Sequence, residues 1–357
     1  MSLLEARGLR KQYGSRVVVD GVDLDVNAGE IVGLLGPNGA GKTTTFRMLV
    51  GMIAPKSGEV TFAGQDVTHA PMYQRARLGL GYLAQESSVF RRLTVEQNIL
   101  AVLELMTTRR GRPFRSTRAQ RKARAAELLD QFGLTRLRRS NASDLSGGER
   151  RRLEIARCLV SEPMLIMLDE PFTGIDPRTI DDIQETIIAL RGNGIGVLLT
   201  DHQVDRTLQI ADRTYVIADG KVISHGSSLE VVNDPHVRQV YLGENINVSG
   251  IAQAVRRRSQ SSVRSLLEDQ AVAEALAELR TLDPIQLAGR LRPRARLSAT
   301  RLIEMMEQND PVVRERAHCV LCELLTTRLP FDPHGAEALR ASQVLRIRQY
   351  LDQRLAG

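Results

Sequence analysis

The stretch GPNGAGKT at residues 36–43 constrains the fold of this chain more than any other feature. It fits the pattern G-x-x-x-x-G-K-[ST], in which the backbone N–H groups of a glycine-rich loop surround phosphate oxygens. The apolar run IVGLLG (31–36) precedes the motif, and the helical pattern TTTFRMLVGM follows it. A strand, a loop and a helix in this order are the setting that a phosphate site requires. The sequence therefore predicts nucleotide binding here.

Two side chains of this loop supply the remaining phosphate chemistry. Lys42 provides a positive charge for the β- and γ-phosphates, and the Thr43 hydroxyl is a ligand for Mg²⁺. A flexible glycine turn without a ligand would explain neither the lysine nor the threonine.

Further apolar runs at 164–169, 196–201 and 214–219 alternate with helical patterning. This alternation predicts an α/β fold with a mostly parallel sheet and helices on its faces. Helical periodicity dominates residues 86–160, which we predict to be a helical subdomain inserted into the α/β core. Its basic insert, 107–124, is expected to be a solvated loop followed by a helix start.

The chain changes character after about residue 248, since Lys221 is the last lysine. We predict a nucleotide-binding domain at 1–247, a linker at 248–265 and a small all-helical extension at 266–357. Asp-Pro pairs at 283–284, 310–311 and 332–333 predict three helix starts. One helical face is predicted to be apolar, with Val313, Ala317, Val320, Leu321 and Leu324.

The composition limits the cell compartments and the binding partners that we expect for this chain. The net charge is +7, but only 4% of residues are aromatic and Trp is absent, so no stacking platform for nucleic acid is expected. Three cysteines argue for a reducing compartment, and the pair Cys319 and Cys322 has no second ligand pair for zinc. Without a signal peptide or an apolar run of 18 residues, we expect a cytosolic chain that reaches a membrane only through partners.

The run MLIMLDE (164–170) is an apolar strand that ends in two acids. Asp169 is placed to reach a metal ion directly or through water, and Glu170 to accept a proton from an attacking water. Acids at strand ends also commonly cap the next helix. The catalytic interpretation depends on the phosphate loop about 130 residues upstream.

Three single residues have both a functional and a structural interpretation. His202 follows another strand end and could hold a water in line with a γ-phosphate, or it could be structural. Gln85 stands where the core passes into the helical insert, and its amide could bind Mg²⁺ or water. Tyr13 could stack on adenine or pack in a core.

The order Tyr13, GPNGAGKT, Gln85, LSGGE, MLDEP, GIDP and His202 resembles an ATP-binding cassette (ABC) ATPase across about residues 1–245. The resemblance implies a P-loop core with an antiparallel β subdomain and the cofactors ATP and Mg²⁺. It implies catalytic roles for Glu170, His202 and Gln85, and metal contacts at Thr43, Gln85 and Asp169. The nucleotide contacts that it implies are Tyr13, Gly36, Pro37, Asn38, Gly39, Ala40, Gly41, Lys42, Thr43, Thr44, Ser146, Gly147, Gly148, Glu149 and Asp176.

The same resemblance gives a role to LSGGERRRLEIARCL at 145–159, a second glycine-rich helix start. Two chains of such ATPases pack head-to-tail, and the signature Ser146-Gly147-Gly148 of one faces the γ-phosphate held by the other. A glycine turn that only caps a helix would not require Ser-Gly-Gly. The implied assembly is a homodimer around two ATP.

Longer stretches such as RARLGLGYLAQESSVFRRLTVEQNILAVLE and HVRQVYLGE are similar to the ATPases of lipopolysaccharide-export transporters. That family implies a peripheral place on the cytoplasmic face of the inner membrane, with two membrane subunits docking near Phe90, Arg91 and Arg92. ATPases of branched-chain amino-acid importers and a regulatory, non-transport ABC protein remain the alternatives. The extension after 248 has no counterpart in the family pattern, and we hypothesise that it contacts the dimer or a partner.

Overall fold

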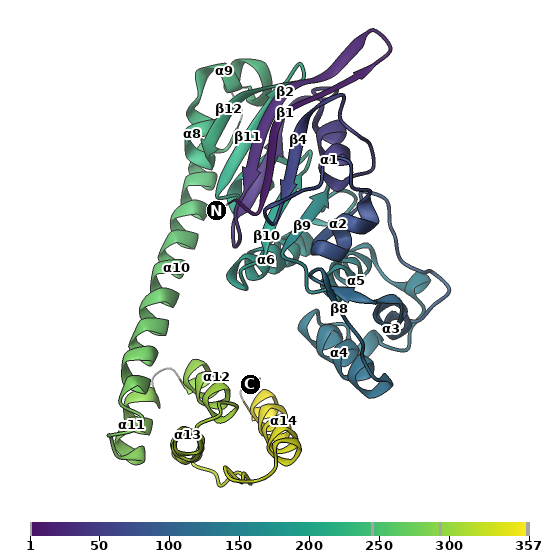
Figure 1. Ribbon diagram of the computed structural model, residues 1–357. Coiled ribbons are helices and arrows are strands. Elements are labelled where there is room, and N and C mark those ends of the chain that lie inside the picture. The colour runs from purple at the N-terminus through teal and green to yellow at the C-terminus, as the bar shows by residue number, and fades with distance from the viewer. Residues whose placement is uncertain (1, 244–245, 293–294, 355–357) are drawn as a thin grey trace. The chain divides into compact units, whose positions relative to one another are not determined.

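The computed structural model describes residues 2–243, 246–292 and 295–354 (Figure 1). The chain divides into two compact units, residues 1–255 and 256–357. The strands are β1 (Leu4–Tyr13), β2 (Arg16–Val26), β3 (Ile31–Leu35), β4 (Ser57–Phe62), β5 (Gln65–Asp66), β6 (Leu80–Leu83), β7 (Thr108–Arg109), β8 (Arg112–Pro113), β9 (Leu165–Asp169), β10 (Gly196–Thr200), β11 (Arg213–Ala218) and β12 (Lys221–Ser227).

The helices of the first unit surround these strands. They are α1 (Lys42–Val50), α2 (Met72–Leu78), α3 (Val95–Leu105), α4 (Arg118–Gln131), α5 (Gly147–Leu159), α6 (Pro177–Gly192), α7 (Val204–Ile210), α8 (Ser228–Asn233) and α9 (Pro235–Val237), with short turns η1 (Thr135–Leu137), η2 (Ala142–Asp144) and η3 (Arg238–Leu242).

The main sheet has the strand order β12-β11-β3-β10-β9-β6, in which only β12 runs antiparallel to its neighbour. Every residue of β3, β9 and β10 is buried, as expected for strands covered on both faces. The predicted α/β class and the predicted strands are confirmed. Because these three strands are parallel, residues 36–43, Glu170 and His202 all lie at the same edge of the sheet.

Alternate residues of the central strands enter two different apolar cores. On β9, Leu165 and Met167 pack with the antiparallel sheet β2-β1-β4-β5 and with α1. Ile166 and Leu168 pack with α3, α5 and α6 on the other face. The sheet is thus held between an antiparallel β layer and a helical layer, which confirms the fold that the family resemblance implied.

The residues predicted as a helical subdomain, 86–160, contain α3, α4 and α5. The basic insert 107–124 forms the short hairpin β7–β8 and then the start of α4. Thr117 begins that helix with a capping box, in which its hydroxyl accepts from the Gln120 N–H and the Gln120 side chain accepts from the Thr117 N–H.

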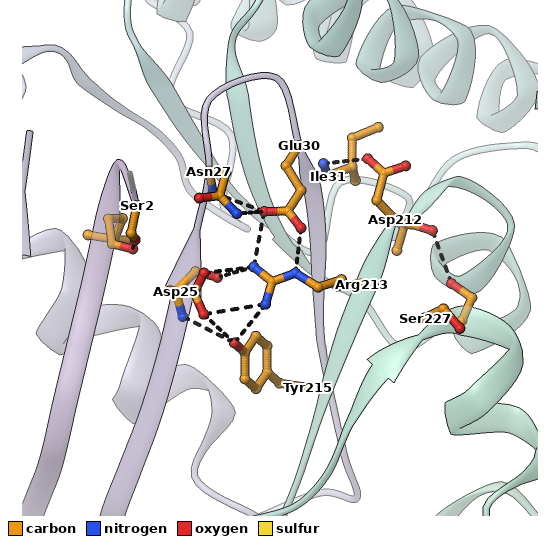
Figure 2. A network of polar contacts seen from close by, with 12 residues as sticks. Ser2, Asp25, Asn27, Glu30, Ile31, Asp212, Arg213, Tyr215 and Ser227 are labelled. Atoms are coloured by element: carbon orange, nitrogen blue, oxygen red, sulfur yellow. Dashed lines mark hydrogen bonds and ion pairs between the residues drawn. The ribbon is translucent and has the colours of Figure 1, made fainter. Parts of the chain in front are cut away.

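A polar network joins β2, the turn before β3, and β11 (Figure 2). The Arg213 guanidinium donates to the Glu30 carboxylate at 2.5 and 3.0 Å and to the Asp25 carboxylate at 2.8 Å. The Tyr215 hydroxyl donates to Asp25 at 2.8 Å. Burial is the largest single influence and raises the pKa values of Asp25 and Glu30. The hydrogen bonds and charge of Arg213, together with the bonds from Tyr215 to Asp25 and from Asn27 to Glu30, lower both pKa values below their ordinary 3.8 and 4.5.

Replacing Arg213 with methionine should lower the free energy of unfolding by about 1–3 kcal/mol at neutral pH, since it leaves two acids without their partner. The folded-state pKa values are the lower ones, so this stabilisation is present above the unfolded values and is lost as pH falls through the folded ones. The difference between the two proteins in urea unfolding should therefore shrink below about pH 4. Arg138→Met at the exposed pair with Glu96 is the control and should change stability by less than about 1 kcal/mol.

The regular elements of the second unit are all helices in its described residues, 256–292 and 295–354, as predicted for the extension. Its helices are α10 (Val248–Ala277), which begins within the first unit, α11 (Pro284–Leu291), α12 (Ala295–Met306), α13 (Pro311–Leu325) and α14 (Glu337–Arg354). The five apolar residues predicted on one face of α13 are all buried in a core of their own. Across the described residues 2–243, 246–292 and 295–354, no helix has the length and apolar character needed to cross a bilayer.

Two details of this region differ from expectation. Residues 248–265, predicted as a linker, lie within the continuous helix α10. The Asp-Pro pairs at 283 and 310 do begin helices, but Asp332-Pro333 does not, because α14 begins at Glu337. The Asp332 carboxylate accepts instead from the His334 N–H at 3.0 Å and forms a turn.

Candidate functional site

At two positions of the phosphate loop, the backbone conformation and its neighbours leave room only for glycine. Gly36 has φ 147°, and a Cβ there would lie 2.0 Å from the Ile217 carbonyl oxygen. Gly41 has φ 105°, and its Cβ would lie 2.7 Å from the Val18 carbonyl oxygen. Gly39, with φ 80°, has open space around it. The loop therefore packs tightly on its protein side and is open on the other, as a phosphate cradle requires.

Lys42 lies over this loop. Its Nζ donates to the carbonyl oxygens of Gly36 at 2.6 Å and Pro37 at 2.9 Å, and the residue is 9% exposed. Burial lowers the pKa of Lys42, and the nearby charge of Glu170 opposes that shift. The remaining loop positions range from exposed to buried: Asn38 and Thr43 exposed, Pro37 and Thr44 half-buried, Ala40 buried.

Glu170 is the centre of a polar cluster at the end of β9. Gln85 Nε2 donates to one carboxylate oxygen at 2.7 Å, and His202 Nε2 lies 2.7 Å from the other. The Thr173 hydroxyl also donates to Glu170, at 3.1 Å. The three residues predicted to be catalytic therefore meet at one carboxylate, although they lie in separate parts of the sequence.

Asp169 is buried beside this cluster and is 6% exposed. Burial raises its pKa, and the Tyr82 hydroxyl donates to it at 3.3 Å. The Asp169 carboxylate, the Thr43 hydroxyl and the Gln85 amide oxygen are oxygen donors of the kind that Mg²⁺ prefers. These residues fit the ion that the sequence implies.

The signature begins helix α5 with a capping box. The Ser146 hydroxyl accepts from the Glu149 N–H at 3.3 Å, and the Glu149 carboxylate accepts from the Ser146 N–H at 2.8 Å. Gly148 is buried, and a Cβ there would lie 2.2 Å from Thr179 Cγ2. Gly147 is exposed, and its nearest neighbour would be the Gly174 carbonyl oxygen at 3.6 Å. Packing within the chain explains Gly148 and leaves the need for Gly147 unexplained.

The other predicted residues lie outside the Glu170 cluster. Asp176 is the N-cap of α6 and accepts from the Thr179 N–H at 3.1 Å. Tyr13 is 51% exposed, so the alternative of a packed core residue is wrong. Phe90 is 44% exposed, and the Arg157 guanidinium carbon lies 4.6 Å from the centre of its ring. Arg91 and Arg92 are exposed beside it.

Sequence reasoning missed three buried polar residues at the site. Asp201 accepts from the N–H groups of Phe172 and Gln203, both at 2.8 Å, and burial raises its pKa. Arg151 and Glu154 form a buried ion pair of 3.0 Å on α5. The sequence contains one signal for Arg151 and Glu154, which is that both charged residues lie among the apolar residues of a predicted helix.

One edge of the sheet thus carries a phosphate loop, a buried acid, and a glutamate that glutamine and histidine contact. This arrangement defines a P-loop nucleotide hydrolase of the ATP-binding cassette class. The ABC transporter family model matches residues 19–173, and a model described as branched-chain amino acid ATP-binding cassette transporter matches residues 221–246.

Similar proteins place the chain within that class. The lipopolysaccharide export system ATP-binding protein LptB of Haemophilus influenzae is 49% identical over 248 residues, which are 70% of this chain and all of the relative. LptB of Escherichia coli K12 is 48% identical, with the same coverage. The ADP conformation of MJ1267, an ATP-binding cassette of an ABC transporter, matches with a TM-score of 0.62 and 28% identity, over 68% of this chain and all of that one. The chain belongs to the ABC transporter family, as an ATP-binding subunit and ATPase.

Proposed function

We propose that this chain hydrolyses ATP at the Glu170 cluster and so drives a transporter. The observation that carries the proposal is the convergence of Gln85 and His202, each at 2.7 Å, on the Glu170 carboxylate beside the phosphate loop. Glu170 would accept the proton of the attacking water, and His202 would hold that water in line with the γ-phosphate. Lys42, now bonded to loop carbonyls, would turn to the β- and γ-phosphates.

Gln85 would leave Glu170 when nucleotide binds and use its amide oxygen for the metal or the water. Thr43, Asp169 and Gln85 would hold Mg²⁺, some through water, and the ion would neutralise charge between the β- and γ-phosphates. Tyr13, exposed at the end of β1, would stack on the adenine.

We propose that two copies enclose two ATP, each phosphate loop facing the signature of the other copy. Three features support this arrangement. Ser146 and Gly147 are exposed at the start of α5, and a helix N-terminus attracts an anion through its dipole. Among the described residues, a Cβ at Gly147 would meet only the Gly174 carbonyl oxygen, at 3.6 Å, so there is room beside it for a ligand. Asp176 is the N-cap of α6, and Thr179 of the same helix lies against Gly148. Asp176 is therefore close to the signature.

The proposed cargo is lipopolysaccharide or a related lipid, moved by two separate membrane subunits that bind near Phe90, Arg91 and Arg92. Full-length coverage of several LptB proteins at 48–51% identity supports it. The chain would then act on the cytoplasmic face of the inner membrane. A branched-chain amino-acid-type importer is the second candidate, because residues 221–246 match the model described for such cassettes.

Replacing Phe90 with alanine should reduce recovery of co-expressed membrane subunits at least tenfold, because an exposed aromatic is a typical anchor of an interface. Phe114→Ala is the control, since Arg109 also stacks on that ring, at 4.0 Å, in the hairpin region. The assay is affinity purification from detergent extracts, followed by ATPase measurement with lipopolysaccharide or with branched-chain amino acids. Stimulation by amino acids alone would favour the importer, and equal recovery for both variants would remove Phe90 from the interface.

A further inference from the structure

Arg151 lies on the second turn of α5, and its side chain is 6% exposed. Its guanidinium donates to the carbonyl oxygens of Asp169 at 3.2 Å, Glu170 at 3.1 Å and Pro171 at 3.2 Å. A further bond of 3.1 Å goes to the carbonyl oxygen of Ala84, the residue before Gln85. One side chain therefore holds the backbone on both sides of the Gln85–Glu170 contact.

Glu154, one turn later on the same helix, completes this arrangement. It is 3% exposed, pairs with Arg151 at 3.0 Å, and accepts from the Ser87 hydroxyl at 2.7 Å and the Ser88 N–H at 3.0 Å. Arg157, a further turn along, donates to the Ser88 carbonyl oxygen at 2.6 Å. Three successive turns of α5 thus fix residues 84–88.

The backbone that Arg151 holds is an unusual one. Glu170 has φ 49°, in the left-handed region that non-glycine residues rarely adopt. Such a conformation persists where its surroundings determine it. Here the Glu170 N–H donates to the Thr200 carbonyl oxygen at 2.8 Å, and Arg151 holds the Glu170 carbonyl oxygen.

We infer that Arg151, fixed by Glu154, is a positioning residue that sets the Glu170 carboxylate and Gln85 relative to helix α5. This inference rests on the proposed ATPase activity of the Glu170 cluster. Since α5 begins at the signature Ser146, the helix that meets the other copy's nucleotide also aims the base of its own chain. A shift of α5 is thereby transmitted to Glu170.

The test is Arg151→Lys in the full chain. Lysine keeps a positive charge beside Glu154, but one ammonium group does not span the carbonyls of Ala84 and of 169–171. We expect kcat, expressed per bound ATP, to fall about 10- to 100-fold, with KM for ATP within about threefold. A change that only unfolded part of the protein would alter the number of ATP sites and leave turnover per site unchanged.

Arg75→Lys is the matched control. Arg75 is 1% exposed and donates to four backbone carbonyls, from Met48, Leu49, Thr68 and Ala70, away from Glu170. It should lower the melting temperature as Arg151→Lys does, yet retain turnover per site within about twofold. If Arg151→Lys keeps the parental turnover per site, or if Arg75→Lys loses as much turnover per site, the inference is wrong while the proposed function stands. A parental chain without turnover would overturn both the inference and the proposed function.

Discussion

Replacing Glu170 with glutamine is expected to reduce ATP turnover by about 10²- to 10⁴-fold while ATP binding persists. Glutamine has nearly the shape of glutamate and keeps hydrogen-bonding capacity toward Gln85 and His202, but its amide does not accept a proton from water. Hydrolysis that would separate the two copies then fails. The variant should therefore accumulate as an ATP-bound dimer of about twice 39.6 kDa, measured by light scattering with Mg²⁺ and ATP.

The control for this change is Glu162→Gln, because Glu162 pairs with Arg109 outside the site, at 3.0 Å. Its turnover should equal that of the parental chain. Normal hydrolysis by Glu170→Gln would assign the general base to another residue. If Glu170→Gln binds ATP without turnover but stays a monomer, the result would support the catalytic role of Glu170 and contradict the proposed dimer.

Adjacent glycines of the signature should respond in opposite ways to alanine. In Gly148→Ala the new methyl lies 2.2 Å from Thr179 Cγ2, so the fold should lose about 1–3 kcal/mol. In Gly147→Ala the methyl has room within the chain, so the melting temperature should stay near the parental one. Its turnover should nevertheless fall about 100-fold, because the methyl projects where the γ-phosphate of the other copy would approach.

Three measurements separate the two effects: thermal unfolding, binding of ATP to the dilute chain, and turnover at high protein concentration. Gly147→Ala should lose only the third. Parental turnover in Gly147→Ala would mean that nothing approaches the exposed start of α5. A melting temperature lowered as much as in Gly148→Ala would mean that Gly147 is required by packing within its own chain.

The parallel sheet and the cluster at its edge were predictable because short, fully apolar runs precede each polar group. The runs that form β3, β9 and β10 predicted buried strands, and the carboxyl ends of parallel strands lie at one edge of a sheet. The phosphate loop, Glu170 and His202 came together for this reason. Gln85 was singled out by its place where the core passes into the helical insert, and the family resemblance gave it a catalytic role.

Features that depend on the tertiary structure were less predictable from the sequence. Arg151 and Glu154 are neighbours on a helix, but the carbonyls that Arg151 contacts come from segments 67 and 18–20 residues away. Asp332-Pro333 has the local signal for a helix start, yet the Asp332 side chain forms a turn instead. The predicted linker 248–265 has few apolar residues, but no proline interrupts it, and it forms the first part of α10.

The most direct test of a site shared by two copies is to mix Glu170→Gln with Gly147→Ala, two variants each expected to bind ATP without appreciable turnover. In a mixed dimer, one site combines the intact loop and Glu170 of the Gly147→Ala chain with the intact signature of the other. Random pairing should restore about a quarter of the parental activity per chain, because half of the dimers are mixed and each has one complete site. A mixture no more active than its two components, with both chains folded and binding ATP, would contradict a site built from two copies.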